Sequence, residues 1–223
     1  MLGTVRFLGL AMALGCFAAF GAGFSHTGTF LNDNDLKYFN VTLGADGVLT
    51  VRTFGYAGGL NQLGNTIADG GFAPALWVFD GAGTLLAQDS VGGTVPICNG
   101  RGIDPTTGSC YDALVPVFLP AGAYTVVLSQ QGNNPLGVLS DGFFYSPPNG
   151  NDPDFTGDNS GQIGTKFVDP FGIAVRNGNW AVDFTGDTLR SASAADIPEP
   201  GSACLLLMGV AALAGRRYSR SRR

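Results

Sequence analysis

The sequence predicts an all-β protein: an antiparallel β-sandwich of jelly-roll-like type, with a signal helix at its N-terminus and a transmembrane helix at its C-terminus. Three observations support this fold class. Several short stretches alternate between apolar and polar residues with a period of two, as half-buried strands do. Turn-forming residues separate these stretches, and 35 of the 223 residues are glycine. No central stretch shows the sustained 3.6-residue apolar repeat of an amphipathic helix.

The first 24 residues have the order of a secretory signal peptide. Arg6 supplies a positive charge, an apolar stretch follows at 7–20, and small residues occupy 21–23. This order predicts export and cleavage near residues 21–25. Cys16 offers a lipoprotein alternative, but the apolar stretch continues beyond it, which argues against cleavage there.

The predicted sandwich body comprises residues 25–187. The stretches 37–43 and 124–129 alternate, so we expect each to form a strand with one buried face. The stretch PALWVF, residues 74–79, is apolar on both faces and predicts a central strand that is covered on both sides.

Turn signals separate these strands. Asp46–Gly47 predicts a hairpin, in which glycine supplies a positive φ angle. Further turns are expected at 80–83 and 120–123. We expect the last strand at 180–184 and a linker at 188–197.

The charges are distributed unevenly along the chain. Six of the twelve basic residues lie in the two terminal segments, whereas sixteen of the seventeen acidic residues lie between them. The central part therefore has a net charge of about −10, which repels nucleic acid and anionic membranes. We expect no nucleic-acid partner.

The C-terminal segment, residues 198–223, has three parts in a fixed order. Pro198, Glu199 and Pro200 precede the uncharged stretch 201–215, and five arginines follow: Arg216, Arg217, Arg220, Arg222 and Arg223. As a helix, that stretch is about 22 Å long, which is short for a bilayer core of about 30 Å. Basic residues after a span stay on the cytoplasmic side. This order predicts a brief membrane anchor with the body outside.

This three-part segment resembles a PEP-CTERM sorting signal. The resemblance implies that a membrane protease called exosortase recognises the segment and cleaves near the tripeptide. It also implies transient anchoring in the inner membrane of a Gram-negative bacterium, followed by sorting to the cell surface or to an extracellular matrix of exopolysaccharide.

The body has a second resemblance. The segments GTFLNDNDLKYFNVTL, PALWVFDGAGTLLAQDS and LPAGAYTVVLSQ are similar to bacterial pre-peptidase C-terminal (PPC) domains, which are small β-sandwiches of secreted proteins. YAGGLNQLGNTIADGGFAPALWVFD and FVDPFGIAVRNGNWAVDFTG resemble a family of secreted PEP-CTERM proteins known as DVUA0089-like. These resemblances imply the sandwich fold and export, without a defined activity.

Two cysteines remain between the signal peptide and the anchor. Cys98 and Cys110 flank a turn-rich segment in a protein that we expect to be exported, so we expect a disulfide between them. Zinc is disfavoured because the two thiols lack nearby histidine partners.

Two acidic clusters are candidates for structural calcium. Asp33 and Asp35 form the first, and the second comprises Asp152, Asp154 and Asp158. Clustered carboxylates and carbonyls supply the six to eight oxygens that Ca²⁺ takes. The spacing departs from an EF-hand, and aspartates are also ordinary turn residues, so solvated loops are the alternative.

The sequence offers little support for catalysis, and we expect the protein not to be an enzyme. His26 is the only histidine and lies beside the predicted cleavage site, where a Ser-His-Asp relay would lack support. No GxSxG, GxGxxG or phosphate-binding loop occurs, and no cofactor is expected apart from calcium. Paired aspartates leave a secreted hydrolase as an alternative.

Exposed aromatic residues would allow a carbohydrate-binding module as a further alternative. Trp77 lies in the doubly apolar stretch and is expected in the core. The late aromatics, which could instead stack on an extracellular polysaccharide, are Phe143, Phe144, Tyr145, Phe155 and Trp180.

Overall fold

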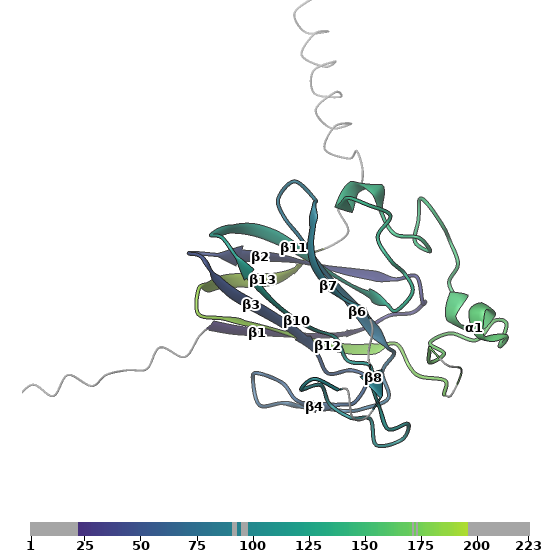
Figure 1. The fold of residues 1–223 in the computed structure, drawn as a ribbon. Coiled ribbons are helices and arrows are strands. Elements are labelled where there is room, and N and C mark those ends of the chain that lie inside the picture. The colour runs from purple at the N-terminus through teal and green to yellow at the C-terminus, as the bar shows by residue number, and fades with distance from the viewer. Residues whose placement is uncertain (1–21, 91–92, 95–97, 171, 173, 196–223) are drawn as a thin grey trace, which may run out of the picture.

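Two antiparallel sheets packed face to face form the protein (Figure 1). A computed structural model of the chain describes residues 22–90, 93–94, 98–170, 172 and 174–195. The described residues are mostly strands and turns, so the predicted all-β class is confirmed.

The first sheet has four strands in the order β1 (Ala22–Thr29), β12 (Asn179–Gly186), β3 (Gly47–Thr53) and β10 (Leu114–Leu119). The second has five in the order β13 (Leu189–Ala195), β2 (Leu36–Leu43), β11 (Gly122–Gln130), β6 (Pro74–Phe79) and β7 (Leu85–Asp89). Two short ribbons pair β4 (Gly59–Leu60) with β5 (Thr66–Ile67) and β8 (Gly93–Thr94) with β9 (Ser109–Cys110). A 3-10 turn, η1 (Leu139–Asp141), and a short helix, α1 (Phe155–Ser160), lie between β11 and β12.

The main hydrophobic core lies between the two sheets. The alternating residues of β2 and β11 point into it, as their period-two pattern predicts: Phe39, Val41, Leu43, Tyr124, Val126 and Leu128 are all buried. The opposite wall comes from the first sheet and includes Leu49, Val51, Val182 and Phe184. Burial of this apolar surface is the main stabilising contribution to the fold.

The second sheet is also covered on its outer face. Trp77 and Val127 point outward and pack with Phe143, which belongs to the long segment after β11. The Trp77 indole N–H donates to Ser129 Oγ at 2.9 Å, so its polar atom is paired inside this cluster. All six residues of β6 are buried, which confirms the prediction of a doubly covered strand at 74–79.

The predicted hairpin at Asp46–Gly47 is wrong. β2 and β3 belong to different sheets, so this turn takes the chain across the core. The turn at 120–123 does the same between β10 and β11. The turn at 80–83 does join neighbouring antiparallel strands, β6 and β7. Both crossing turns contain glycine, and the first also contains aspartate. These residues favour a reversal of the chain whichever sheet the next strand joins.

The last strand is also later than the sequence suggests. β13 follows Trp180–Phe184 and pairs with β2, so 189–195 belongs to the sandwich and is not part of a linker. β1 begins at Ala22, three residues before the predicted start of the body. The described body thus extends from Ala22 to Ala195.

Among the residues that the structure describes, no helix has the length and hydropathy needed to cross a bilayer. The predicted signal helix lies almost entirely outside the described residues. The predicted anchor at 198–223 lies wholly outside them.

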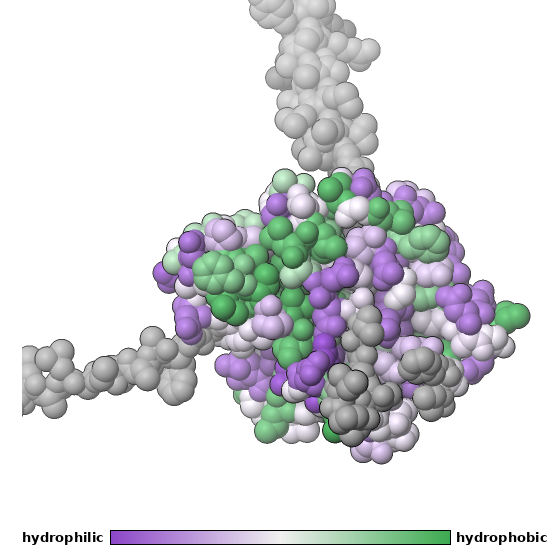
Figure 2. Space-filling model, viewed as in Figure 1, coloured by the Kyte–Doolittle hydropathy of each residue, from purple (hydrophilic) through white to green (hydrophobic). Residues whose placement is uncertain are grey.

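On the visible face, hydrophobic residues gather in the upper left and centre of the body, and hydrophilic residues lie around them (Figure 2). Val48 of β3 and Phe118 of β10 are cross-strand partners, and both are more than 40% exposed. These two side chains are therefore neighbours on the outer face of the first sheet, and apolar atoms make up much of the accessible surface of folded proteins in general.

Candidate functional site

The C-terminal end of β13 lies only a few residues before the tripeptide at 198–200. Ala195 is the last residue of β13 and pairs with Tyr38 of β2. Only positions 196 and 197 separate it from Pro198. Three fully extended residue steps cover about 10 Å. Any enzyme that acts at the tripeptide therefore works within a short distance of the folded body.

Three of the predicted calcium ligands lie together beside α1. One carboxylate oxygen from each of Asp152, Asp154 and Asp158 falls within 4.8 Å of the others. The pKa of Asp152 is raised by burial and by the negative charges of Asp158 and Asp154. The three carboxylates would supply three of the six to eight oxygens that Ca²⁺ takes, and the cation would relieve their mutual repulsion.

The structure does not bring Asp33 and Asp35 into this group. Asp33 is fully buried and accepts hydrogen bonds from Phe167 N at 2.7 Å and from Thr156 N at 2.9 Å and Oγ1 at 2.5 Å. Asp35 accepts from the backbone N–H groups of Leu31 and Asn32. Both carboxylates thus hold backbone segments in place.

Calcium is expected to raise the melting temperature of the exported protein through Asp152, Asp154 and Asp158. At a free concentration of about 100 times the Kd, binding to the folded state alone would add about 2.7 kcal/mol to the free energy of unfolding. Thermal unfolding with calcium and with a chelator measures the effect. An Asp154→Asn, Asp158→Asn double variant should lose it, whereas Asp187→Asn, which removes an exposed charge elsewhere, should keep it. Equal midpoints with calcium and chelator would contradict the site.

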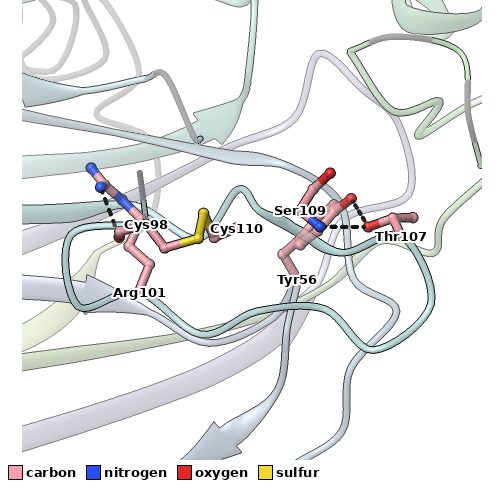
Figure 3. The surroundings of a disulfide bond; sticks show 6 residues. All are labelled: Tyr56, Cys98, Arg101, Thr107, Ser109 and Cys110. Atoms are coloured by element: carbon pink, nitrogen blue, oxygen red, sulfur yellow. Dashed lines mark hydrogen bonds between the residues drawn. A yellow bond between two sulfur atoms is a disulfide. The ribbon is translucent and has the colours of Figure 1, made fainter. Parts of the chain in front are cut away.

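The predicted disulfide is present between Cys98 and Cys110 (Figure 3). It closes a loop whose interior is also held by hydrogen bonds. Arg101 donates to the carbonyl oxygen of Cys98, and Thr107 N and Oγ1 each donate to Asp104 Oδ2 at 2.7 Å. The loop is therefore ordered by both covalent and polar contacts.

A buried ionic cluster ties this loop to the late part of the chain. Arg176 contacts Asp104 at 3.0 Å and Asp169 at 3.3 Å, and its guanidinium lies 3.9 Å from the centre of the Tyr56 ring. The Tyr56 hydroxyl donates to Asp169 Oδ2 and contacts Thr107 Oγ1. Burial alone would raise the pKa of Asp104, but hydrogen bonds from Thr107 and the charge of Arg176 lower it.

Asp112 fixes the segment that follows β3. Its carboxylate is 1% exposed and accepts from Tyr56 N at 3.1 Å, Ala57 N at 2.9 Å and Thr53 Oγ1 at 2.9 Å. Burial raises the pKa of this carboxyl, and the three donors oppose the rise. As with Asp33, both oxygens are occupied by the protein's own donors.

Most of the late aromatics pack inside the protein. Phe143, Phe155 and Trp180 are buried, Tyr145 is half-buried, and Phe144 is exposed. Tyr145 and Phe155 stack with their ring centres 4.0 Å apart. Trp180 lies over Gly28 of β1, where a Cβ would come within 2.3 Å of the indole, so glycine makes room for this ring. The five residues do not form one exposed stacking surface.

His26 lies within β1 and pairs with Val182 of β12, so the position that we expected to lack structural support belongs to the sandwich. Its ring packs against Phe39 and Phe184, and its Nε2 contacts the carbonyl oxygen of Ala192 at 2.9 Å. Because a carbonyl only accepts, Nε2 is the donor. The side chain links β1 to β13 across the edge of the sandwich.

Sequence reasoning missed the ionic cluster of Arg176, Asp104, Asp169 and Tyr56. These residues are widely separated in the chain, so no local spacing indicates their meeting. The one available signal is the scarcity of basic residues in the body, which makes Arg176 conspicuous.

The comparison with protein families supports the C-terminal assignment. Residues 196–223 match the PEP-CTERM protein-sorting motif. This motif implies export, processing by an exosortase and membrane-associated sorting towards the cell surface. No curated protein sequence matches the chain significantly. The match covers the tail alone, so the resemblance of the body to PPC and DVUA0089-like proteins stays a prediction.

Proposed function

We propose that this chain is a noncatalytic structural protein of the cell surface or extracellular matrix of a Gram-negative bacterium. It is exported through its signal peptide and held briefly in the inner membrane by residues 198–223. An exosortase then cleaves near the tripeptide and delivers the sandwich outward. The observation behind this proposal is the sorting-motif match at 196–223, directly after the last strand of a folded, acidic body.

The three parts of the C-terminal segment have separate roles in this scheme. The arginines stay on the cytoplasmic side and set the orientation of the segment. The short apolar stretch holds the chain in the bilayer with a smaller apolar length than a permanent span uses. Pro198 and Pro200 cannot donate a backbone N–H, which disfavours continued strand pairing at the cleavage region.

The use of the acidic side chains supports a structural role for the body. Asp33 and Asp112 are buried and bind backbone N–H groups. Asp104 and Asp169 are buried against Arg176. A glycosidase needs two carboxylates that face a substrate and lie about 5–10 Å apart. These four carboxylates instead hold loops in place.

Intact-mass analysis of the protein from its native host tests the proposed sorting. We expect a mature chain that lacks both the signal peptide and most of residues 198–223. Replacing Pro198, Glu199 and Pro200 together by alanine should leave the C-terminal segment attached. Ser193→Ala, an exposed change on β13 close to the motif, is the matched control and should be processed normally.

A native chain that retains both Met1 and Arg223 would contradict the proposal. So would normal C-terminal processing of the triple alanine variant. An activity screen with glycan and ester substrates tests the noncatalytic assignment separately, and turnover above the blank would overturn it.

A further inference from the structure

The edge of the second sheet is open beside the first two residues of β2. β13 pairs with β2 in an unbroken register from Ser191 to Ala195, where Ala195 lies opposite Tyr38. Leu36 and Lys37 pair with β11 on one side and have no strand partner on the other side within the described residues. Successive residues of a strand direct their N–H and C=O groups to opposite edges. One of these two residues therefore offers both groups to the open edge.

A groove lies along this open edge. Its volume is about 960 Å³, and Leu36 and Lys37 line it together with Ala194 of β13 and Thr29 at the end of β1. Ala194 and Thr29 are exposed, and Leu36 and Lys37 are half-buried, so all four residues remain accessible to solvent. The groove thus begins where the described part of β13 ends, and it has room for further residues of an extended chain.

The register of β13 identifies the residues that would follow into the groove. When the pairing is continued beyond Ala195, position 196 lies opposite Lys37 and position 197 lies opposite Leu36. The sequence has Asp196 and Ile197 at these two positions. Residues directly opposite each other in an antiparallel pair have Cβ atoms about 4.5–5.5 Å apart, so their side chains interact.

The first of these two pairs joins opposite charges. Alternation along β2 places Lys37 on the same face as Phe39, at the open end of the space between the sheets. The ammonium group of Lys37 forms no hydrogen bond or ion pair with the residues that the structure describes. The carboxylate of Asp196 would supply an anionic partner, and opposite charges across a strand pair stabilise the pairing.

The second pair joins two apolar side chains. Leu36 packs against the outer-face cluster that contains Trp77, and Ala195 packs against the same cluster. Ile197 follows Ala195 by two residues, so in a continued strand it lies on the same face and extends this cluster. Pro198 comes next and has no backbone N–H, which disfavours further pairing.

We propose that the open edge of β2 at Leu36 and Lys37 is the docking site of residues 196–197 of this same chain. These residues lengthen β13 by the pairs Asp196–Lys37 and Ile197–Leu36. The tripeptide at 198–200 then begins at the edge of the sandwich without a free linker, so an enzyme that cleaves it must approach the folded body. The docking does not rest on the sorting function, because it forms within the uncleaved chain.

Zero-length cross-linking with a carbodiimide tests the first pair. The sample is the full chain after removal of the signal peptide, purified in detergent from cells without an exosortase, so that residues 196–223 are intact. We expect mass spectrometry to identify an amide bond between Lys37 and Asp196. Asp196→Asn should abolish this cross-link, whereas Asp187→Asn, an exposed change between β12 and β13, should leave it. Cross-linking of Lys37 to Asp35 alone, or no cross-link of Lys37, would overturn the proposal.

Charge reversal tests the same pair without chemical modification. Lys37→Glu or Asp196→Lys alone places like charges opposite each other, so each should speed amide hydrogen exchange in peptides covering 36–38 and 194–197 by about threefold. The double variant restores opposite charges and should return the exchange to the rate of the unchanged protein. Asp187→Lys is the matched control and should not rescue Lys37→Glu. Single variants without faster exchange, or a double variant without rescue, would overturn the docking.

Discussion

Replacing Asp33 with alanine should lower the free energy of unfolding by about 3–5 kcal/mol, because it leaves buried donors without an acceptor. The carboxylate lies where three separate parts of the chain meet. It accepts hydrogen bonds from Thr156 N at the start of α1, from Thr156 Oγ1, and from Phe167 N in the segment beyond the helix. Without it, the segment from α1 to Phe167 loses three hydrogen bonds to the chain that leads into β2, and those from Lys166 to Leu31 and Asn32 remain.

Urea unfolding of the purified exported protein measures this loss of unfolding free energy. Asp35→Ala is the matched control, because Asp35 is only half-buried and its donors lie within its own turn. We expect about 1 kcal/mol or less from the control. The measurements are made with calcium and with a chelator. A loss for Asp33→Ala that appears only with calcium would identify Asp33 as a metal ligand and contradict the hydrogen-bonding role.

Removing the disulfide should lower the free energy of unfolding by about 3 kcal/mol, since the bond restricts the unfolded chain. Cys98 and Cys110 are twelve positions apart, and both are buried. For a body of this size, the change corresponds to a decrease of about 6–12 °C in melting temperature. Hydrogen bonds from Thr107 and the contact of Asp104 with Arg176 would still hold the loop in the folded state.

A Cys98→Ser, Cys110→Ser double variant, compared with the oxidised protein by thermal unfolding, tests this prediction. Reduction and alkylation of the unchanged protein provides a second measurement that needs no substitution. Arg176→Met in the same background tests the loop's second attachment and should lower stability further. A double variant that melts within 1 °C of the oxidised protein would contradict a stabilising role for the bond.

The sequence predicts the strands better than their arrangement. Alternation identifies β2 and β11, and the doubly apolar stretch identifies β6, because burial of a face is recorded in the residues themselves. The pairing of strands is not recorded in this way. Asp46–Gly47 has hairpin chemistry, yet the chain crosses to the other sheet there, since β2 finds its partners in β11 and β13.

β13 was missed because its sequence, LRSASAA, has few large apolar residues. An edge strand buries little on its open side, so alanine and serine suffice where β2 already supplies Phe39 and Val41. The disulfide and the sorting motif could be predicted from the sequence because each depends on the spacing of residues that are close together in the chain. The Arg176 cluster depends on contacts between distant segments, which one sequence does not reveal.

The position of β13 has a mechanical consequence. β13 joins the second sheet through β2 alone, and the chain that leads to the tripeptide leaves from its Ala195 end. Among the described strand pairs, a pulling force on the C-terminus therefore acts first on the Ala195–Tyr38 pair, and the pairs then separate one after another towards Leu189. Separating the pairs one by one takes less force than sliding two whole strands past each other, which breaks all their hydrogen bonds together. In the proposed scheme, cleavage near the tripeptide removes the chain segment through which this tension would act.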